Sequence, residues 1–151
     1  MRPALAFVAV CCLSAASSAT ARASQDTTEI PESVRELRNP VTPSPEGLRA
    51  ARVLWKKHCE TCHGVSGRGD GPNARLHEQR KNVAPKDLTE AAFQKDIADG
   101  EIYWRIGNGI IDADDIIMPA YAEKIPSDVE RWRLVVFVRE LGKAKAPSQS
   151  R

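Results

Sequence analysis

The chain has 151 residues, enough for one domain of ordinary size with flanking segments, and only 5% of them are aromatic. A core made from these side chains alone would be thin. Lys and Arg number 22 against 20 Asp and Glu, and Arg2 and Arg22 lie within the first 23 residues, so the rest of the chain is close to neutral. Net charge therefore gives no support for nucleic acid or an anionic membrane as the partner.

The first 23 residues have the features of a signal peptide. Arg2 precedes an apolar run over residues 4–13, and Ala21-Arg22-Ala23 has the pattern of a cleavage site. The run is shorter than the ~20 residues that span a bilayer, although an uncleaved anchor is the alternative. We expect residues 1–23 to be cleaved, the mature chain to be periplasmic, and no transmembrane segment to remain.

Residues 24–43 are polar and contain three prolines, so we predict an N-terminal extension or linker there. The domain is predicted over 44–145, with a tail over 146–151. Its first helix begins at Ser44-Pro45, an N-cap followed by proline. Four apolar residues then recur at helical spacing and lead directly into Cys59: Leu48, Ala51, Leu54 and Trp55.

Further helices follow a glycine-rich loop that comes after His63. The pattern predicts a helical turn near 73–79, a helix over 89–94, and another from Asp99 to the breaker at 107–109. An acidic loop over 112–115 then leads to 116–119.

The last helix has the clearest boundaries. Ser127 and Glu130 form a capping box after a proline, and Gly142 is expected to end the helix. No alternation typical of strands is present. The sequence therefore predicts an all-α domain.

The string Cys59-Glu60-Thr61-Cys62-His63 carries the chemistry. Two thiols three positions apart reach the two vinyl-derived carbons of one haem, and the adjacent imidazole is placed to ligate its iron. We expect one covalent haem c, attached through Cys59 and Cys62 and ligated by His63. The alternatives are weaker. A thioredoxin-like pair needs a βαβ unit, zinc needs a second ligand pair, and a disulfide would close a very small loop.

Met118 is the candidate for the second axial ligand. It is the only methionine after Met1, it precedes Pro119, and it lies 55 residues beyond His63. A thioether opposite histidine favours electron transfer over oxygen chemistry. His77 is the competitor, although its polar neighbours are typical of a surface histidine.

These features together resemble the class I monohaem cytochromes c, particularly the small bacterial periplasmic ones, over residues 44–142. The resemblance rests on C-x-x-C-H and the residues before it, the 67–72 loop, and two further segments: 118–121 and 134–139. It implies a helical fold wrapped around the haem, in which helices 45–58 and 128–141 cross at Ala51 and Phe137.

The resemblance also implies a haem environment. The Pro72 carbonyl would accept a hydrogen bond from His63 Nδ1–H, and Trp104 or Arg105 would donate to a haem propionate. An ordinary turn proline, a core tryptophan and a solvated arginine are the alternatives.

The function expected is electron transfer between a donor and an acceptor protein, by a chain that is not itself an enzyme. An open sixth position on the iron would instead indicate a haem enzyme or a gas sensor. Charge is unevenly distributed, at +5 over 44–86 and −7 over 87–123. This separation would orient a partner during encounter, unless it is ordinary scattered surface charge.

Overall fold

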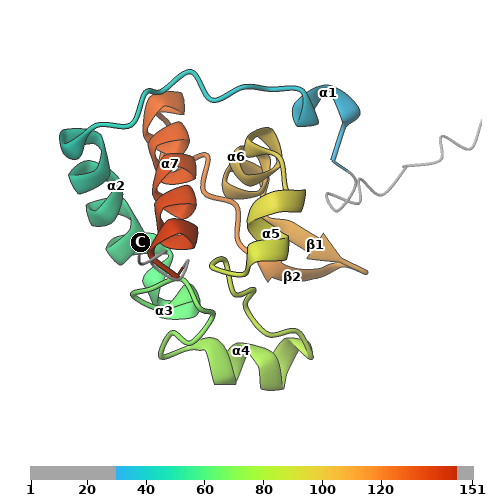
Figure 1. The fold of residues 1–151 in the computed structure, drawn as a ribbon. Coiled ribbons are helices and arrows are strands. Elements are labelled where there is room, and N and C mark those ends of the chain that lie inside the picture. Colours follow the sequence, from blue (N-terminus) through green and yellow to red (C-terminus); the bar gives the residue numbers. More distant parts are fainter. Residues whose placement is uncertain (1–29, 146–151) are drawn as a thin grey trace, which may run out of the picture.

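The computed structural model describes residues 30–145. The predicted signal peptide, residues 24–29 of the extension and the tail over 146–151 lie outside that part. Seven helices and one hairpin follow in chain order: α1 Glu32–Arg35, α2 Pro45–His58, α3 Glu60–His63, α4 Ala74–Lys81, α5 Ala91–Asp96, α6 Asp99–Asn108, β1 Ile110–Asp112, β2 Asp115–Met118 and α7 Asp128–Lys145 (Figure 1). No helix in this part is both long enough and apolar enough to cross a bilayer.

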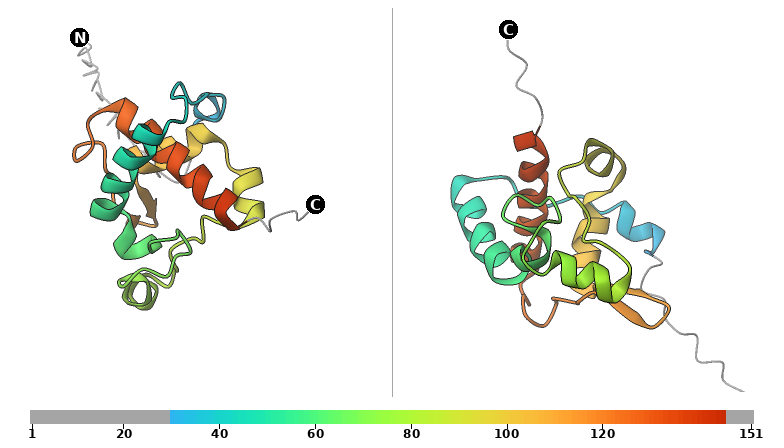
Figure 2. Two further views of the ribbon diagram at one scale, coloured as in Figure 1. Left: turned by 60° about the vertical axis from the view of Figure 1, so that its left-hand side comes forward. Right: turned by 90° about the horizontal axis from the view of Figure 1, so that it is seen from below.

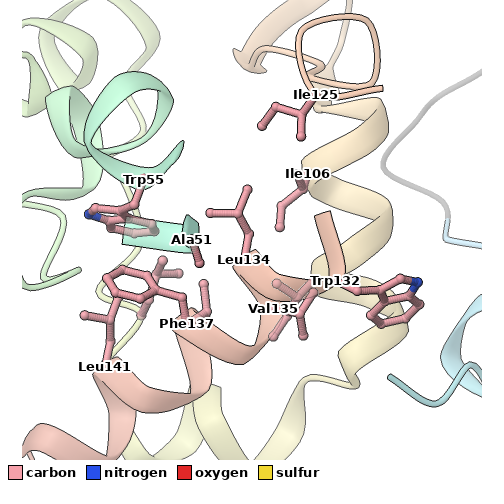
Figure 3. Close-up of a cluster of buried hydrophobic side chains, with 12 residues drawn as sticks. Ala51, Trp55, Ile106, Ile125, Trp132, Leu134, Val135, Phe137 and Leu141 are labelled. Atoms are coloured by element: carbon pink, nitrogen blue, oxygen red, sulfur yellow. The ribbon is translucent and has the colours of Figure 1, made fainter. Parts of the chain in front are cut away.

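The core lies where α2 packs against α7, as predicted. Ser44 caps α2 by accepting a hydrogen bond from the Gly47 amide at 3.0 Å, so the helix begins where the N-cap signal places it. Ala51 and Trp55 on α2 are fully or almost fully buried and lie against Phe137 and Leu134 of α7 (Figure 3). Ile106 of α6 lies on the other side of Leu134, so α6 completes the core.

The region before Ser44 packs against the domain, which differs from the predicted linker. Ile30 and Val34 are both 7% exposed, and α1 lies against α6. Asn39 Nδ2–H donates to the Trp132 carbonyl at 3.1 Å, which fastens the segment to α7. Two apolar residues four positions apart were too short a pattern to predict a helix.

A two-stranded hairpin replaces the predicted acidic loop. β1 and β2 pair antiparallel, with Ile110 opposite Met118 and Asp112 opposite Asp115. The two turn residues, Ala113 and Asp114, both have positive φ, as a two-residue type I′ turn requires. The sequence lacks the Asn-Gly or Asp-Gly pair that usually marks this turn, so the hairpin had no signal.

Helix α7 continues past Gly142 to Lys145, so the predicted C-terminal stop was wrong. A Cβ at Gly142 would overlap the Gln94 side chain of α5. That side chain donates to the Val138 carbonyl at 3.0 Å and to the Leu88 carbonyl at 2.6 Å. The glycine permits close approach of α5 to α7 rather than ending the helix.

Candidate functional site

The C-x-x-C-H string occupies a helical turn at the end of α2. Cys59 caps α2, and its carbonyl accepts the amides of Cys62 at 3.1 Å and His63 at 2.9 Å. This turn brings both cysteines, which are free thiols, next to the histidine. The three residues predicted to hold a haem are therefore placed together by local helix geometry.

The state of the thiols argues against the metal and thiol alternatives. Burial, together with a smaller effect of Cys62, raises the pKa of the Cys59 thiol to about 12, so the unliganded thiol stays protonated at neutral pH. A redox or nucleophilic thiol reacts as the thiolate, so this pKa disfavours a thioredoxin-like role. Among residues 30–145, no three His, Cys, Asp or Glu side chains gather as a metal site. The described residues therefore offer these thiols no further ligands for a zinc site.

His63 is held in the orientation and tautomer that a ligand needs. Its ring lies 5.9 Å, centre to centre, from that of Trp55. Trp55 Nε1–H donates to the carbonyl of Gly64, the residue after His63, at 3.0 Å. His63 Nδ1 lies 3.3 Å from the Lys86 carbonyl, so a proton on Nδ1 leaves the Nε2 lone pair for a metal. Burial lowers the pKa of His63, which favours the neutral ligand form.

The predicted partner of His63, the Pro72 carbonyl, is replaced by that of Lys86. The amides on either side of Pro72 bond to the backbone of the C-x-x-C-H turn: Gly71 to the Cys62 carbonyl and Asn73 to the Thr61 carbonyl. The 71–73 loop is thereby fixed to α3. The Pro85–Lys86 segment instead approaches Gly69 and lies beside the ring. This partner is 23 residues from His63 and carries no motif, so sequence reasoning missed it.

Met118 is the last residue of β2, and the backbone on both sides of it is held by other segments. A Cβ at Gly109 would overlap the Met118 carbonyl, so the two backbones are in close contact. Beyond Met118, the Tyr121 amide donates to the Ile106 carbonyl at 3.0 Å, and the Tyr121 hydroxyl donates to the His58 carbonyl at 2.9 Å. Burial raises the pKa of Tyr121, and the neighbouring Cys59 and Cys62 raise it further. Tyr121 therefore joins the methionine loop to the C-x-x-C-H turn.

The competing ligand, His77, has both ring nitrogens engaged. Nδ1 lies 2.9 Å from the Val83 carbonyl, and Nε2 lies 2.7 Å from the Ile117 carbonyl. A histidine that binds iron must present one nitrogen without such a contact. The predicted surface histidine is thus half-buried and joins α4 to β2.

One face of α6 fits an acidic, bulky group. Trp104 Nε1 and Arg105 Nε are buried, and neither has a hydrogen-bond partner within the described residues. Gly107 is buried, yet a Cβ there would have no atom within 4 Å. Buried donors without acceptors are costly, and open space beside a buried glycine matches a missing neighbour. Haem supplies both acceptor carboxylates and a ring, so these residues fit it.

A helical fold in which α2 packs against α7, with C-x-x-C-H on a turn at the end of α2, defines a c-type cytochrome. Residues 46–138 match the family described as "Cytochrome C oxidase, cbb3-type, subunit III", and the chain belongs to this family. The all-α cytochrome c fold predicted from the sequence is thereby confirmed, with a small two-stranded sheet added. The family binds haem c covalently and uses it for electron transfer.

Similarity to individual proteins is more distant. The chain is 26% identical over 111 residues to the quinohemoprotein alcohol dehydrogenase ADH IIB of Pseudomonas putida, and the match covers 73% of this chain but 14% of that protein. Among solved structures, it is similar to a chain of the reducing HAO-like protein complex of Kuenenia stuttgartiensis, with 30% identity and a TM-score of 0.54. That match covers 71% of this chain and 48% of the other. The chain thus spans less than half of either relative.

Proposed function

We propose that the chain carries one electron at a time through a single haem c attached at Cys59 and Cys62, with His63 and Met118 as axial ligands. The sequence contains one C-x-x-C-H string, which supports a single haem. The observation that carries the axial pair is the engagement of both His77 nitrogens, at 2.9 Å and 2.7 Å, which leaves Met118 as the candidate opposite His63.

The chain's own residues have separable roles in this mechanism. The Lys86 carbonyl holds the proton of His63 on Nδ1, and Trp55 fixes the ring. Trp104 and Arg105 would donate to haem propionates and so satisfy their buried nitrogens. Haem supplies an iron that alternates between Fe(II) and Fe(III). A thioether opposite the imidazole leaves no position for a substrate, which favours transfer over catalysis.

We further propose that the donor and acceptor are exported redox proteins, in the periplasm. Both relatives are larger than this chain and are named as an alcohol dehydrogenase and a protein complex. This supports a role either as a free shuttle or as the electron-transfer subunit of an oxidoreductase complex. In neither role is the chain the enzyme.

The test is the optical spectrum of protein matured in a host that attaches haem c. We expect low-spin bands on reduction and the weak methionine-to-iron charge-transfer band on oxidation. Met118→Ala should lose that band and bind added imidazole, whereas Ile116→Ala, an exposed position on the same strand, should retain it. A high-spin spectrum of the unmodified protein would support a haem enzyme or gas sensor, and colourless protein would exclude haem.

A further inference from the structure

Two polar side chains of helix α4 contact the β1–β2 hairpin. None of its residues is buried, so apolar packing does not explain its position. His77 on α4 bonds to the carbonyl of Ile117, 40 positions away, at 2.7 Å. Lys81, one turn further along, forms an ion pair with Asp115 at the start of β2. Two consecutive turns of α4 therefore hold the two ends of one strand.

The contact of His77 with the Ile117 carbonyl lies at the peptide bond directly before Met118, the candidate ligand. The Ile117 carbonyl belongs to the peptide that joins Ile117 to Met118, so fixing it restricts the backbone from which the thioether projects. On the opposite strand, Ile110 pairs with Met118, and Gly109 contacts its carbonyl. Met118 is thus held from β1 on one side and from α4 on the other.

The other ring nitrogen of His77 lies near a second carbonyl. Nδ1 lies 2.9 Å from the Val83 carbonyl, just beyond the end of α4. Asn82 ends α4 in the left-handed conformation, with φ 53°, and turns the chain so that the Val83 carbonyl comes back to the ring. Both partners are carbonyls, which only accept, so a ring with a single proton donates to one of them. With that proton on Nε2 the ring donates to the Ile117 carbonyl, the shorter contact, and Nδ1 lies against the Val83 carbonyl without a hydrogen bond.

We propose that His77 is a positioning residue that holds β2 so that Met118 stays on the iron. The proposal rests on the function proposed above, because it assumes that Met118 is the axial ligand. His77 does not touch the reacting atoms and acts through the Ile117 peptide. Loss of its long-range bond frees the strand end and lets an external ligand displace the thioether more readily.

Two amide variants separate this role from a merely structural one. In His77→Gln, the side-chain nitrogen takes the place of Nε2 and can still donate to the Ile117 carbonyl. In His77→Asn, it takes the place of Nδ1 and can donate only to the Val83 carbonyl. Each variant keeps a donor at one of the two ring positions and loses the other, so the pair differs in which carbonyl the side chain can reach. We expect both to fold because α4 buries no side chain.

The experiment is a titration of the oxidised holoprotein with imidazole, followed by loss of the methionine charge-transfer band. We expect His77→Asn to bind imidazole about five- to tenfold more tightly than the unmodified protein, as loss of one hydrogen bond implies. His77→Gln should stay within about twofold of it. Hydrogen exchange of the Met118 amide should also rise in His77→Asn, by a similar factor.

The outcomes separate the two proposals. If the unmodified protein lacks the charge-transfer band, Met118 ligation is wrong and the role of His77 falls with it. If the band is present but both variants bind imidazole equally, His77 serves only the stability of α4 and the inference is overturned. Only tighter binding confined to His77→Asn supports it.

Discussion

Trp55 is the side chain that connects the core to the haem attachment turn. Its ring is 2% exposed, lies 5.4 Å from that of Phe137 on α7 and 5.9 Å from that of His63, and donates to the Gly64 carbonyl. One residue therefore contacts both the α2–α7 packing and His63, the proposed ligand.

We expect Trp55→Phe to lower the free energy of unfolding by about 2–3 kcal/mol, because it leaves the buried Gly64 carbonyl without its donor and leaves a small cavity. Urea denaturation of the oxidised holoprotein measures this change. Val53→Ala on the same helix, where the residue is 68% exposed, should change it by less than about 0.5 kcal/mol. Equal effects of the two substitutions would show that the indole hydrogen bond contributes nothing.

His58 makes the free energy of unfolding depend on pH. Burial lowers its pKa, and Lys57 and Lys124 lower it further, while its buried Nε2 has no partner within the described residues. The folded chain therefore binds this proton less readily than the unfolded chain does. The stabilisation is present above about pH 6.5, the ordinary pKa of histidine, and is lost as pH falls through the lowered value.

The prediction is that the urea midpoint of the holoprotein falls as pH decreases from 7 towards 5, and that His58→Gln makes this fall smaller. Both proteins contain His63, so the difference between their urea midpoints at each pH reports the effect of His58. Parallel curves for the two proteins would contradict a role for His58.

At the scale of residues, the sequence predicts contacts between neighbours in the chain and misses contacts between residues far apart in it. Cys59, Cys62 and His63 lie on one helical turn, so their spacing alone brings them together. The acceptor for His63 comes from Lys86, and the Tyr121 hydroxyl reaches the His58 carbonyl, because loops fold back over 23 and 63 residues. No spacing rule specifies which carbonyl such a loop presents.

At the scale of elements, the contact of α1 with α6 depends on one glycine. A Cβ at Gly100 would overlap the Val34 carbonyl oxygen, and a backbone atom cannot move aside as a side-chain end can. Arg35 adds only an ion pair with Glu101 at a separation of 3.9 Å. The position of α1 therefore depends on the absence of a side chain at Gly100.

We expect Gly100→Ala to release α1 and lower the free energy of unfolding by about 1–3 kcal/mol, through the exposure of Ile30 and Val34. Hydrogen exchange of the Val34 and Leu37 amides should rise, while the haem spectrum stays unchanged. Gly47→Ala is the matched control in the first turn of α2. A Cβ there meets the Ser44 hydroxyl at 3.1 Å and otherwise only the side chain of Arg133, so its effect should stay within about 1 kcal/mol. Equal protection of α1 in both variants would contradict this role.

Helices with caps could be predicted, and elements that depend on partners could not. α2 begins at Ser44 as its cap signal indicates. The β1–β2 hairpin had no local signal, because Ala113-Asp114 is an unusual type I′ turn. The signal at Gly142 was misleading, because this glycine permits contact with Gln94 and does not end α7. In each case packing against another element overrides local preference.

At the scale of the whole molecule, the uneven charge of the sequence places basic α2 away from the acidic hairpin (Figure 1), although α4 of the basic segment pairs with the hairpin through Lys81 and Asp115. The basic segment over 44–86 contains α2, α3 and α4, and the acidic segment over 87–123 contains α5, α6 and the hairpin. Figure 1 and the right-hand view of Figure 2 show α2 and the hairpin on opposite sides of the molecule. The C-x-x-C-H turn, where we propose that haem attaches, belongs to the basic segment, so we expect a reactant that approaches this turn to meet positive potential although the net charge is small.

The field at that turn predicts how salt changes the rate of electron transfer with small ions. We expect oxidation of the reduced protein by anionic hexacyanoferrate(III) to slow as ionic strength rises, because salt screens attraction to nearby lysines over ~10 Å at 0.1 M. A cationic cobalt(III) complex should show the opposite trend. Stopped-flow absorbance of the haem measures both rates.

Two charge reversals separate the local field from the net charge. Lys57→Glu lies two residues before Cys59, and Lys95→Glu lies on α5 in the acidic half; both positions are exposed, and both substitutions change the net charge by the same amount. Lys57→Glu should flatten or invert the salt dependence with hexacyanoferrate(III), while Lys95→Glu should leave most of it in place. If the oxidation rates of the two variants depend on ionic strength equally, the net charge of the protein is sufficient to explain the rates. A larger effect at Lys57 would mean that oxidants approach through the basic half, and that an acidic surface is the feature to seek in a natural partner.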